Sequence, residues 1–275
     1  MPLPDTFQFS QNRLQDFVDC PRRFELRWVL TQPWPALLPE QPAKFEQQMQ
    51  RGSALHHLAH QAALGLDPER LAATIHDPLL AEWWRAFQDH PPANLPSASR
   101  WPEITLSAPL GGYRLRAKYD LLAVEPRERL VIVDWKGVQK PPSRAALARR
   151  LQTRVYRFLA VRAGASVNGG QPPWPEQVEM VYWFAAQGGR CQRFPYDARQ
   201  YAADADYLAG LIADIAARQE PGWPLTEDER RCRFCQYRSY CQRQVEPFFV
   251  ADLEDDWEEE EDMDIDLVQI AEIEF

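Results

Sequence analysis

The spacing of the apolar residues changes from a helical period to a strand period near residue 100, and returns to a helical period near residue 143. Helices are predicted over 9–30, 45–64, 71–87, 143–163 and 197–219. Strands are predicted over 103–109, 113–124, 130–135, 177–185 and 191–195, with Gly111 and Gly112 marking a hairpin. This order predicts an α/β fold in which helices flank a mixed sheet.

The composition limits the class of protein. The chain has 275 residues, of which 45% are hydrophobic, and this is enough to build one substantial core. No run of about 18 apolar residues occurs, so no membrane-spanning helix is predicted. The first 16 residues lack the basic and apolar regions of a signal peptide. We therefore expect a cytoplasmic protein with no membrane partner.

The acidic residues are concentrated at one end of the chain. The segment 252–275 holds 13 of them and no Lys or Arg, whereas the whole chain carries a net charge of −9. The rest of the chain therefore carries +4, which permits binding to nucleic acid without demonstrating it. The composition of the segment predicts a disordered tail.

Two adjacent predicted strands each place an aspartate near the same end. Asp120 lies on one strand, and Asp134 on the next is followed two residues later by Lys136 on the same face. Burying two carboxylates and an ammonium together is costly unless they hold a divalent cation. Mg²⁺ or Mn²⁺ would suit these oxygen ligands and phosphodiester hydrolysis, with the lysine assisting the water. A solvated surface hairpin is the alternative interpretation.

The helix predicted over 143–163 carries further candidates. Gln152 and Tyr156 are four residues apart and therefore share a face. The segment 143–162 contains six arginines and no acidic residue, and this unbalanced charge favours contact with a phosphate backbone. The arginines that we expect to make these contacts are Arg149, Arg150, Arg154 and Arg157. A solvated basic face is the alternative, although such a face usually includes glutamates.

Histidines on the helix predicted over 45–64 are candidates for a further metal ligand. His56, His57 and His60 all qualify, and the spacing of His56 and His60 also fits zinc. A lone histidine on a helix is more often structural than a ligand. The sequence has no H-E-x-x-H motif, so a zinc protease is not supported.

Three of the five cysteines lie within ten residues. Cys232, Cys235 and Cys241 have the spacing C-x-x-C-x(5)-C, which favours zinc or an iron–sulfur cluster and requires a fourth ligand. Cys20 and Cys191 are both candidates for that ligand. Cys191 lies in a predicted strand, where a buried apolar thiol is the simpler interpretation.

Together these residues resemble the RecB-like branch of the PD-(D/E)XK nucleases, and most closely its iron–sulfur members. These are the AddB nuclease domain and the CRISPR-associated exonucleases that process spacer precursors. The resemblance runs from Cys20 to Cys241. Each motif is weak alone, but the five occur in the family's order. In the family, one cysteine precedes the nuclease core and three follow it, which leaves Cys191 without a place.

The remaining motifs assign site residues by resemblance. G-x-x-x-H matches Gly52 and His56, which implies His56 as the histidine ligand of the metal. The first metal-binding aspartate, the D-x-K pair, the Q-x-x-x-Y motif and the cluster cysteines match Asp120, Asp134, Lys136, Gln152, Tyr156, Cys20, Cys232, Cys235 and Cys241. The family often has glycine three residues before the first aspartate, and Ala117 stands there in this sequence.

The resemblance implies a restriction-endonuclease-like core within 101–200. It implies a helical segment over 1–100, a 4Fe–4S lobe over 201–248 and an acidic tail over 249–275. The implied activity is hydrolysis of DNA, as an exonuclease on single strands or ends. Asp120, Asp134 and His56 would hold Mg²⁺ or Mn²⁺, and Lys136 would assist the water. Gln152 and Tyr156 would orient the substrate.

Other interpretations remain open. The chain could be a catalytically idle DNA-binding or scaffold subunit, although the intact Asp120, Asp134 and Lys136 set argues against it. Zinc could take the place of the iron–sulfur cluster. No G-x-x-x-x-G-K-[ST] motif is present, so unwinding would need a helicase partner, and a CRISPR-type partner is also consistent. The acidic tail either solubilises the protein, competes with DNA or docks a partner.

Overall fold

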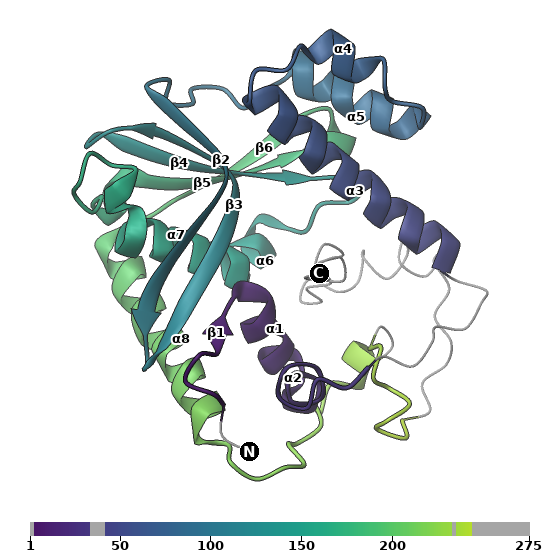
Figure 1. The fold of residues 1–275 in the computed structure, drawn as a ribbon, viewed down its shortest axis with the longest axis vertical. Coiled ribbons are helices and arrows are strands. Elements are labelled where there is room, and N and C mark those ends of the chain that lie inside the picture. Colours follow the sequence, from purple (N-terminus) through teal and green to yellow (C-terminus); the bar gives the residue numbers. More distant parts are fainter. Residues whose placement is uncertain (1–2, 34–41, 233–234, 244–275) are drawn as a thin grey trace.

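The computed structural model describes residues 3–33, 42–232 and 235–243, so the acidic tail lies outside the described residues. Within these residues, six strands form one sheet with helices on both faces (Figure 1). The strands are β1 (Gln8–Phe9), β2 (Ser99–Leu110), β3 (Tyr113–Glu125), β4 (Arg129–Lys136), β5 (Val178–Phe184) and β6 (Arg190–Pro195). The helices are α1 (Gln11–Asp19), α2 (Pro21–Phe24), α3 (Pro42–Ala63), α4 (Pro68–Ala72), α5 (Pro78–Asp89), α6 (Arg144–Arg149), α7 (Leu151–Ala163) and α8 (Ala198–Ala217). The predicted α/β fold with a mixed sheet is confirmed.

The sheet divides along β3. Its strand order is β1-β3-β4-β5-β6, and β2 pairs with β3 outside this path. β4 and β5 are parallel, and the other long pairs are antiparallel. Arg114 and Leu115 of β3 pair with β1, whereas Leu121 to Glu125 pair with β4. β3 and β4 therefore separate on the N-terminal side of Leu121, at Asp120.

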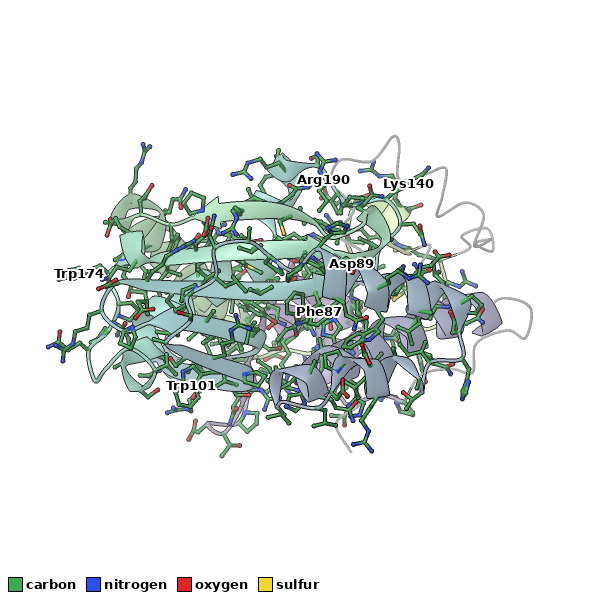
Figure 2. The ribbon with its side chains drawn as sticks, turned by 90° about the horizontal axis from the view of Figure 1, so that it is seen from above. Phe87, Asp89, Trp101, Lys140, Trp174 and Arg190 are labelled. Carbon is green, nitrogen blue, oxygen red and sulfur yellow. The ribbon has the colours of Figure 1, made fainter. Side chains whose placement is uncertain are left out.

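Apolar side chains from the helices cover both faces of the sheet. On one face α7 and α8 contribute Leu159 and Leu208 to a large core. On the other face α3 and α5 build a second core. There, Phe87 of α5 lies against the sheet (Figure 2), with its ring centroid 5.1 Å from that of Trp135 and 5.8 Å from that of Trp183. In the described ranges, no helix has both the length and the apolar character needed to cross a membrane.

The prediction of a single helix over 9–30 is wrong. Phe9 ends β1, Ser10 caps α1 as a hydrogen-bond acceptor, and a second helix begins at Pro21. Cys20 between the two helices has an extended backbone, with φ −162° and ψ 110°, because a residue before proline disfavours the helical conformation. The break places Cys20 at a turn instead of on the face of a helix.

The helix predicted over 143–163 is also interrupted. Ser143 caps α6, and its hydroxyl accepts a hydrogen bond from the Ala146 N–H at 3.2 Å. Arg150 then adopts a ψ of 137° and ends α6, and α7 begins at Leu151. The change of direction places Gln152 in the first turn of α7, where its side chain reaches Asp134. No glycine or proline marks this break in the sequence.

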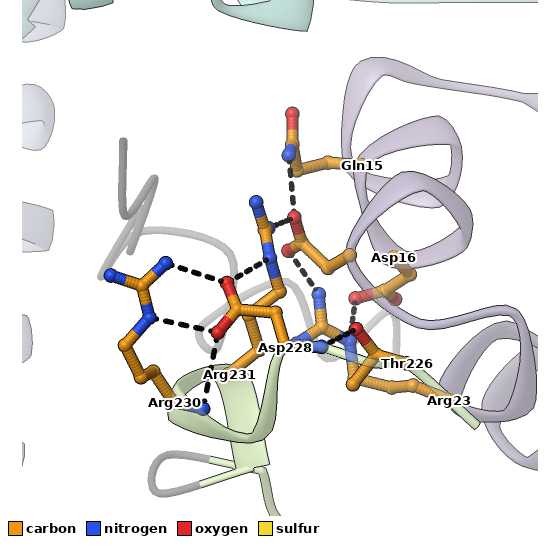
Figure 3. A network of polar contacts seen from close by, with 8 residues as sticks. Gln15, Asp16, Arg23, Thr226, Asp228, Arg230 and Arg231 are labelled. Carbon is orange, nitrogen blue, oxygen red and sulfur yellow. Dashed lines mark hydrogen bonds and ion pairs between the residues drawn. The ribbon is translucent and has the colours of Figure 1, made fainter. Parts of the chain in front are cut away.

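A polar network joins the N-terminal helices to a segment near residue 230 (Figure 3). Asp19 accepts hydrogen bonds from Gln15 at 2.8 Å, from Arg23 at 2.5 Å and from Arg231. Arg23 also forms an ion pair with Asp16 at 2.8 Å. Both aspartates are buried, and several donors compensate their charges, as burial of a carboxylate requires.

Glu25 forms a second link between the same two parts of the chain. Its carboxylate is 1% exposed and accepts hydrogen bonds from the backbone N–H groups of Gly222 and Trp223, at 2.7 and 2.9 Å. The ring of Phe24 stacks on that of Trp223, with the centroids 5.6 Å apart. The chain is thereby joined across 197 residues.

We expect Glu25→Ala to lower the free energy of unfolding by about 2–5 kcal/mol, because it leaves two backbone donors without their acceptor and Arg22 without its buried partner. Urea denaturation followed by circular dichroism measures this. Glu220→Ala removes an exposed carboxylate from the same segment and should change stability by less than about 0.5 kcal/mol. Equal effects of the two substitutions would contradict the link.

Candidate active site

Two carboxylates lie where β3 and β4 separate. Because Leu121 is paired with Val133, the next positions in this register are Asp120 and Asp134. The Oδ2 of Asp120 accepts a hydrogen bond from the backbone N–H of Trp135 at 2.9 Å. This bond replaces the strand pairing that ends at Leu121, and it fixes the orientation of the Asp120 carboxylate.

Asp134 and Lys136 form a buried ion pair on the same face of β4, as their spacing predicts. The side chains are 3% and 6% exposed, and Lys136 Nζ lies 3.1 Å from Asp134 Oδ2. Gln152 of α7 donates to Asp134 Oδ1 at 2.8 Å. Burial raises the pKa of Asp134 to about 6; Lys136 opposes this shift and the nearby Asp120 adds to it. A carboxylate in this state gains strongly from a further cation.

His56 of α3 lies against Asp120, with its Nδ1 3.1 Å from Asp120 Oδ1. Burial would lower the pKa of His56, but the Asp120 carboxylate outweighs it and raises the pKa to about 9. His56 in turn overcomes the effect of burial on Asp120 and lowers the pKa of that carboxyl. His57 instead lines a hollow between α3, α4 and α5. The structure thus brings His56 to the aspartates, as the sequence motif implies.

Glu103 is a site residue that the sequence analysis missed. Pro102 faces Leu121 and Ile104 faces Tyr119, so Glu103 lies opposite Asp120. Its φ of 55° is rare for a residue with a side chain, and such backbone strain concentrates at functional sites. One ligand atom each from His56, Glu103 and Asp120 lies within 4.8 Å of the others. Asp134 is not among these three residues; Gln152 donates to its Oδ1, and Lys136 Nζ lies 3.1 Å from its Oδ2.

Tyr156 lies one turn after Gln152, but its hydroxyl points toward α1. It accepts a hydrogen bond from Gln11 Nε2 at 3.2 Å, and its ring packs against Tyr119. The structure therefore places Tyr156 between α7 and α1, with its hydroxyl on Gln11. Gln152 contacts Asp134 directly. Tyr156 instead joins α7, the helix that carries Gln152, to α1.

Two of the four arginines proposed to contact phosphates are engaged inside the protein. Arg154 forms an ion pair with Asp204 of α8 at 2.5 Å. Arg157 is buried and donates to the backbone carbonyls of Thr153 and Pro195, at 3.0 and 2.9 Å. Arg150 is also buried, and Arg149 is exposed at the end of α6. A DNA contact by Arg154 or Arg157 would require these internal contacts to break.

Four cysteines line one largely enclosed cavity, next to the network of Figure 3. They are Cys20, Cys232, Cys235 and Cys241, so the structure brings together the set that the motif implies. Burial raises the pKa of Cys235 to about 11, although Arg23 opposes the shift. Cys191 lies apart on β6, where its thiol donates to the Gly189 carbonyl at 3.6 Å. The structure therefore places Cys20 with the other three cysteines, and Cys191 elsewhere.

Comparison with known proteins agrees with this architecture. A family model of the PD-(D/E)XK nuclease superfamily matches residues 8–242. Among 23 matching solved chains, one is a proposed exonuclease from Eubacterium rectale, with 11% identity and a TM-score of 0.51, covering 89% of this chain and 91% of that chain. Another, SSO0001, has 14% identity and a TM-score of 0.41 over 89% of both chains. No curated protein matches the sequence.

The family match extends from β1 to the segment that holds Cys241, and it includes both carboxylates, the lysine and the histidine of the site. At 11% identity, the likeness to the Eubacterium rectale structure concerns the fold alone. The family model spans far more than half of the sequence. The chain therefore belongs to the PD-(D/E)XK nuclease superfamily.

Proposed function

We propose that this nuclease is a metal-dependent deoxyribonuclease of the RecB-like branch that acts as an exonuclease on single strands or free ends. The buried Asp134–Lys136 pair, beside Asp120 where the sheet divides, carries this proposal. Burying an ion pair costs desolvation energy, which can exceed the attraction between the two charges. A scaffold protein would gain nothing from this cost. An idle subunit is therefore the less favoured function.

The residues present fit a divalent cation. Asp120, Asp134 and His56 offer oxygen and nitrogen donors, and Glu103 adds a carboxylate. Asp134 Oδ2 is buried without a hydrogen-bond donor, although Lys136 lies 3.1 Å away. Oxygen-rich donor sets favour Mg²⁺ or Mn²⁺. Such a cation, when bound, polarises a phosphoryl oxygen and lowers the pKa of a water molecule.

The protein's own groups complete the chemistry. Lys136 Nζ lies 3.1 Å from Asp134 Oδ2 and 5.8 Å from the centroid of the Tyr182 ring. From there its ammonium can stabilise the negative charge that develops on a phosphate oxygen. Gln152 holds Asp134 in one orientation, and Tyr182 in turn lies 3.4 Å from Gln152. The site is thus preorganised by buried neighbours.

We further propose that the four cysteine thiols hold a 4Fe–4S cluster that staples the N-terminal helices to the C-terminal lobe. Clustered thiolates are the ligands that such clusters use. The support is the set of four thiols around one cavity and its match to the motif of the iron–sulfur members. A zinc ion, which clustered thiolates also bind, is the second candidate.

A helicase or a CRISPR-type protein is the proposed partner. The sequence contains no nucleotide-binding motif of the G-x-x-x-x-G-K-[ST] type, so the chain is not expected to unwind DNA by itself. Its strands or ends would then be supplied by a separate unwinding activity. This part of the proposal rests on the family resemblance and on the proposed activity.

We expect Asp134→Asn and Lys136→Gln each to reduce cleavage of end-labelled DNA by about 100-fold or more in Mn²⁺ or Mg²⁺. The controls are Asp89→Asn, at an exposed position at the end of α5, and Lys140→Gln, in the loop after β4. Both controls should cleave like the wild type. A wild-type protein that binds DNA and cuts none would favour the scaffold interpretation.

We expect Mn²⁺ binding at pH 7 to release about one proton, because His56, whose pKa is raised to about 9, must be neutral to act as a ligand. Metal affinity should therefore rise with pH up to about pH 9. Calorimetry in two buffers of different ionisation enthalpy measures the proton count. His56→Gln should abolish the release, and His57→Gln should retain it. Equal release by the two variants would contradict His56 as a ligand.

We expect anaerobically purified wild-type protein to be brown and to contain iron and acid-labile sulfide. Cys235→Ser should remove the colour and lower the melting temperature, because the link between the two ends is lost. Cys191→Ser, outside the cavity, should retain both. A colourless wild-type protein that contains stoichiometric zinc would replace the cluster by a zinc site.

A further inference from the structure

A row of basic side chains on β3 leads to the candidate active site. Arg114, Arg116 and Lys118 alternate with three fully buried residues, Leu115, Ala117 and Tyr119. The basic side chains therefore occupy the face of β3 that is not packed into the core. Asp120 follows Lys118 by two residues, so the row ends beside the site. We infer that this row binds the phosphates of an extended single nucleic-acid strand and guides the strand to the metal-binding carboxylates.

The spacing of the row fits a nucleic-acid backbone. Alternate residues of a strand are about 7 Å apart, which is close to the separation of successive phosphates along one strand. β2 and β3 continue past the end of the pairing between β3 and β4 (Figure 1). Along this stretch β3 pairs with β2 on one side and, at Arg114, with β1 on the other, and the three cations follow its length.

The neighbouring strand adds polar groups instead of competing acids. Ser107 faces Arg116 across the β2–β3 pair, and Thr105 faces Lys118. Arg114 donates to the Ser107 hydroxyl at 3.0 Å. Where the row meets the site, Lys118 forms an ion pair with Glu103. The row thus joins the active site through this ion pair.

A single strand is the favoured occupant. A row of three cations can contact three successive phosphates of an extended strand, whereas the phosphates of one duplex strand wind around the helix axis. Guanidinium groups bind phosphate oxygens through paired hydrogen bonds. The inference rests on the proposed nuclease function for its direction toward Asp120, but binding by the row does not require catalysis.

The test uses the full chain and a fluorescein-labelled oligothymidylate, with EDTA present so that no cleavage occurs. We expect Arg114→Gln combined with Arg116→Gln to weaken binding about tenfold, and to reduce the slope of log K against log salt by about 1.4, or 0.7 per lost phosphate contact. Arg85→Gln combined with Arg199→Gln, at exposed positions away from β3, should change the affinity less than about twofold. Arg114→Glu provides a second variant at an exposed position.

Two further measurements separate folding and catalysis from binding. The double variant should keep the melting temperature and the Mn²⁺-dependent hydrolysis of bis(p-nitrophenyl) phosphate, a phosphodiester too small to reach the row. The wild type should bind the oligothymidylate more tightly than a blunt duplex of equal length, and the double variant should lose most of that preference. An equal loss of affinity for duplex and single strand would overturn the single-strand assignment.

Unchanged affinity and salt slope in both the double variant and Arg114→Glu would overturn the inference. Tighter binding by these variants would also overturn it, and would mean that the row holds the chain's own acidic segment 252–275. A wild-type protein that binds through the row but hydrolyses neither the oligonucleotide nor the small phosphodiester would contradict the proposed function and support this inference.

Discussion

The separation of β3 from β4 is the constraint on which the site depends. β3 changes partner within its length, from β1 at Arg114 and Leu115 to β4 from Leu121 onward. A sheet that continued its pairing would satisfy the backbone at Asp120 with another strand. Here the Asp120 carboxylate accepts a hydrogen bond from the Trp135 N–H instead. The carboxylates can therefore approach each other and the lysine without breaking the core.

The elements around this division explain why the charges tolerate burial. Gln152 reaches Asp134 because α7 starts anew after Arg150, and His56 reaches Asp120 from the opposite face. Each helix is anchored by its own apolar core. The two cores make the polar centre rigid, and a rigid arrangement of charges stabilises a transition state without reorganisation. The N-terminal segment takes part through α1, since Gln11 donates a hydrogen bond to the Tyr156 hydroxyl.

The five longer strands, their order along the chain and the D-x-K pair were predictable because apolar period and charge are local properties of the sequence, whereas the short β1 was missed. The breaks at Cys20 and Arg150 divide helices that apolar spacing alone joins, and the Arg150 break carries no glycine or proline. Asp204 neutralises Arg154 across 50 residues. The local sequence does not show this pair, so it predicts an unbalanced basic face on the helix that holds Arg154. Glu103 was missed because a left-handed backbone brings its side chain to the site, and no residue type signals that conformation in advance.

The link from Glu25 to Gly222 and Trp223 has a consequence for how the protein folds. These contacts join positions 197 residues apart, and such distant pairing is slow because loop closure must precede it. During synthesis, the N-terminal helices are made first but must wait for almost the whole described chain before their partners exist. Until then Glu25 lacks these two backbone donors, whereas Asp16 can already pair with Arg23 and Arg27, which lie in the same segment.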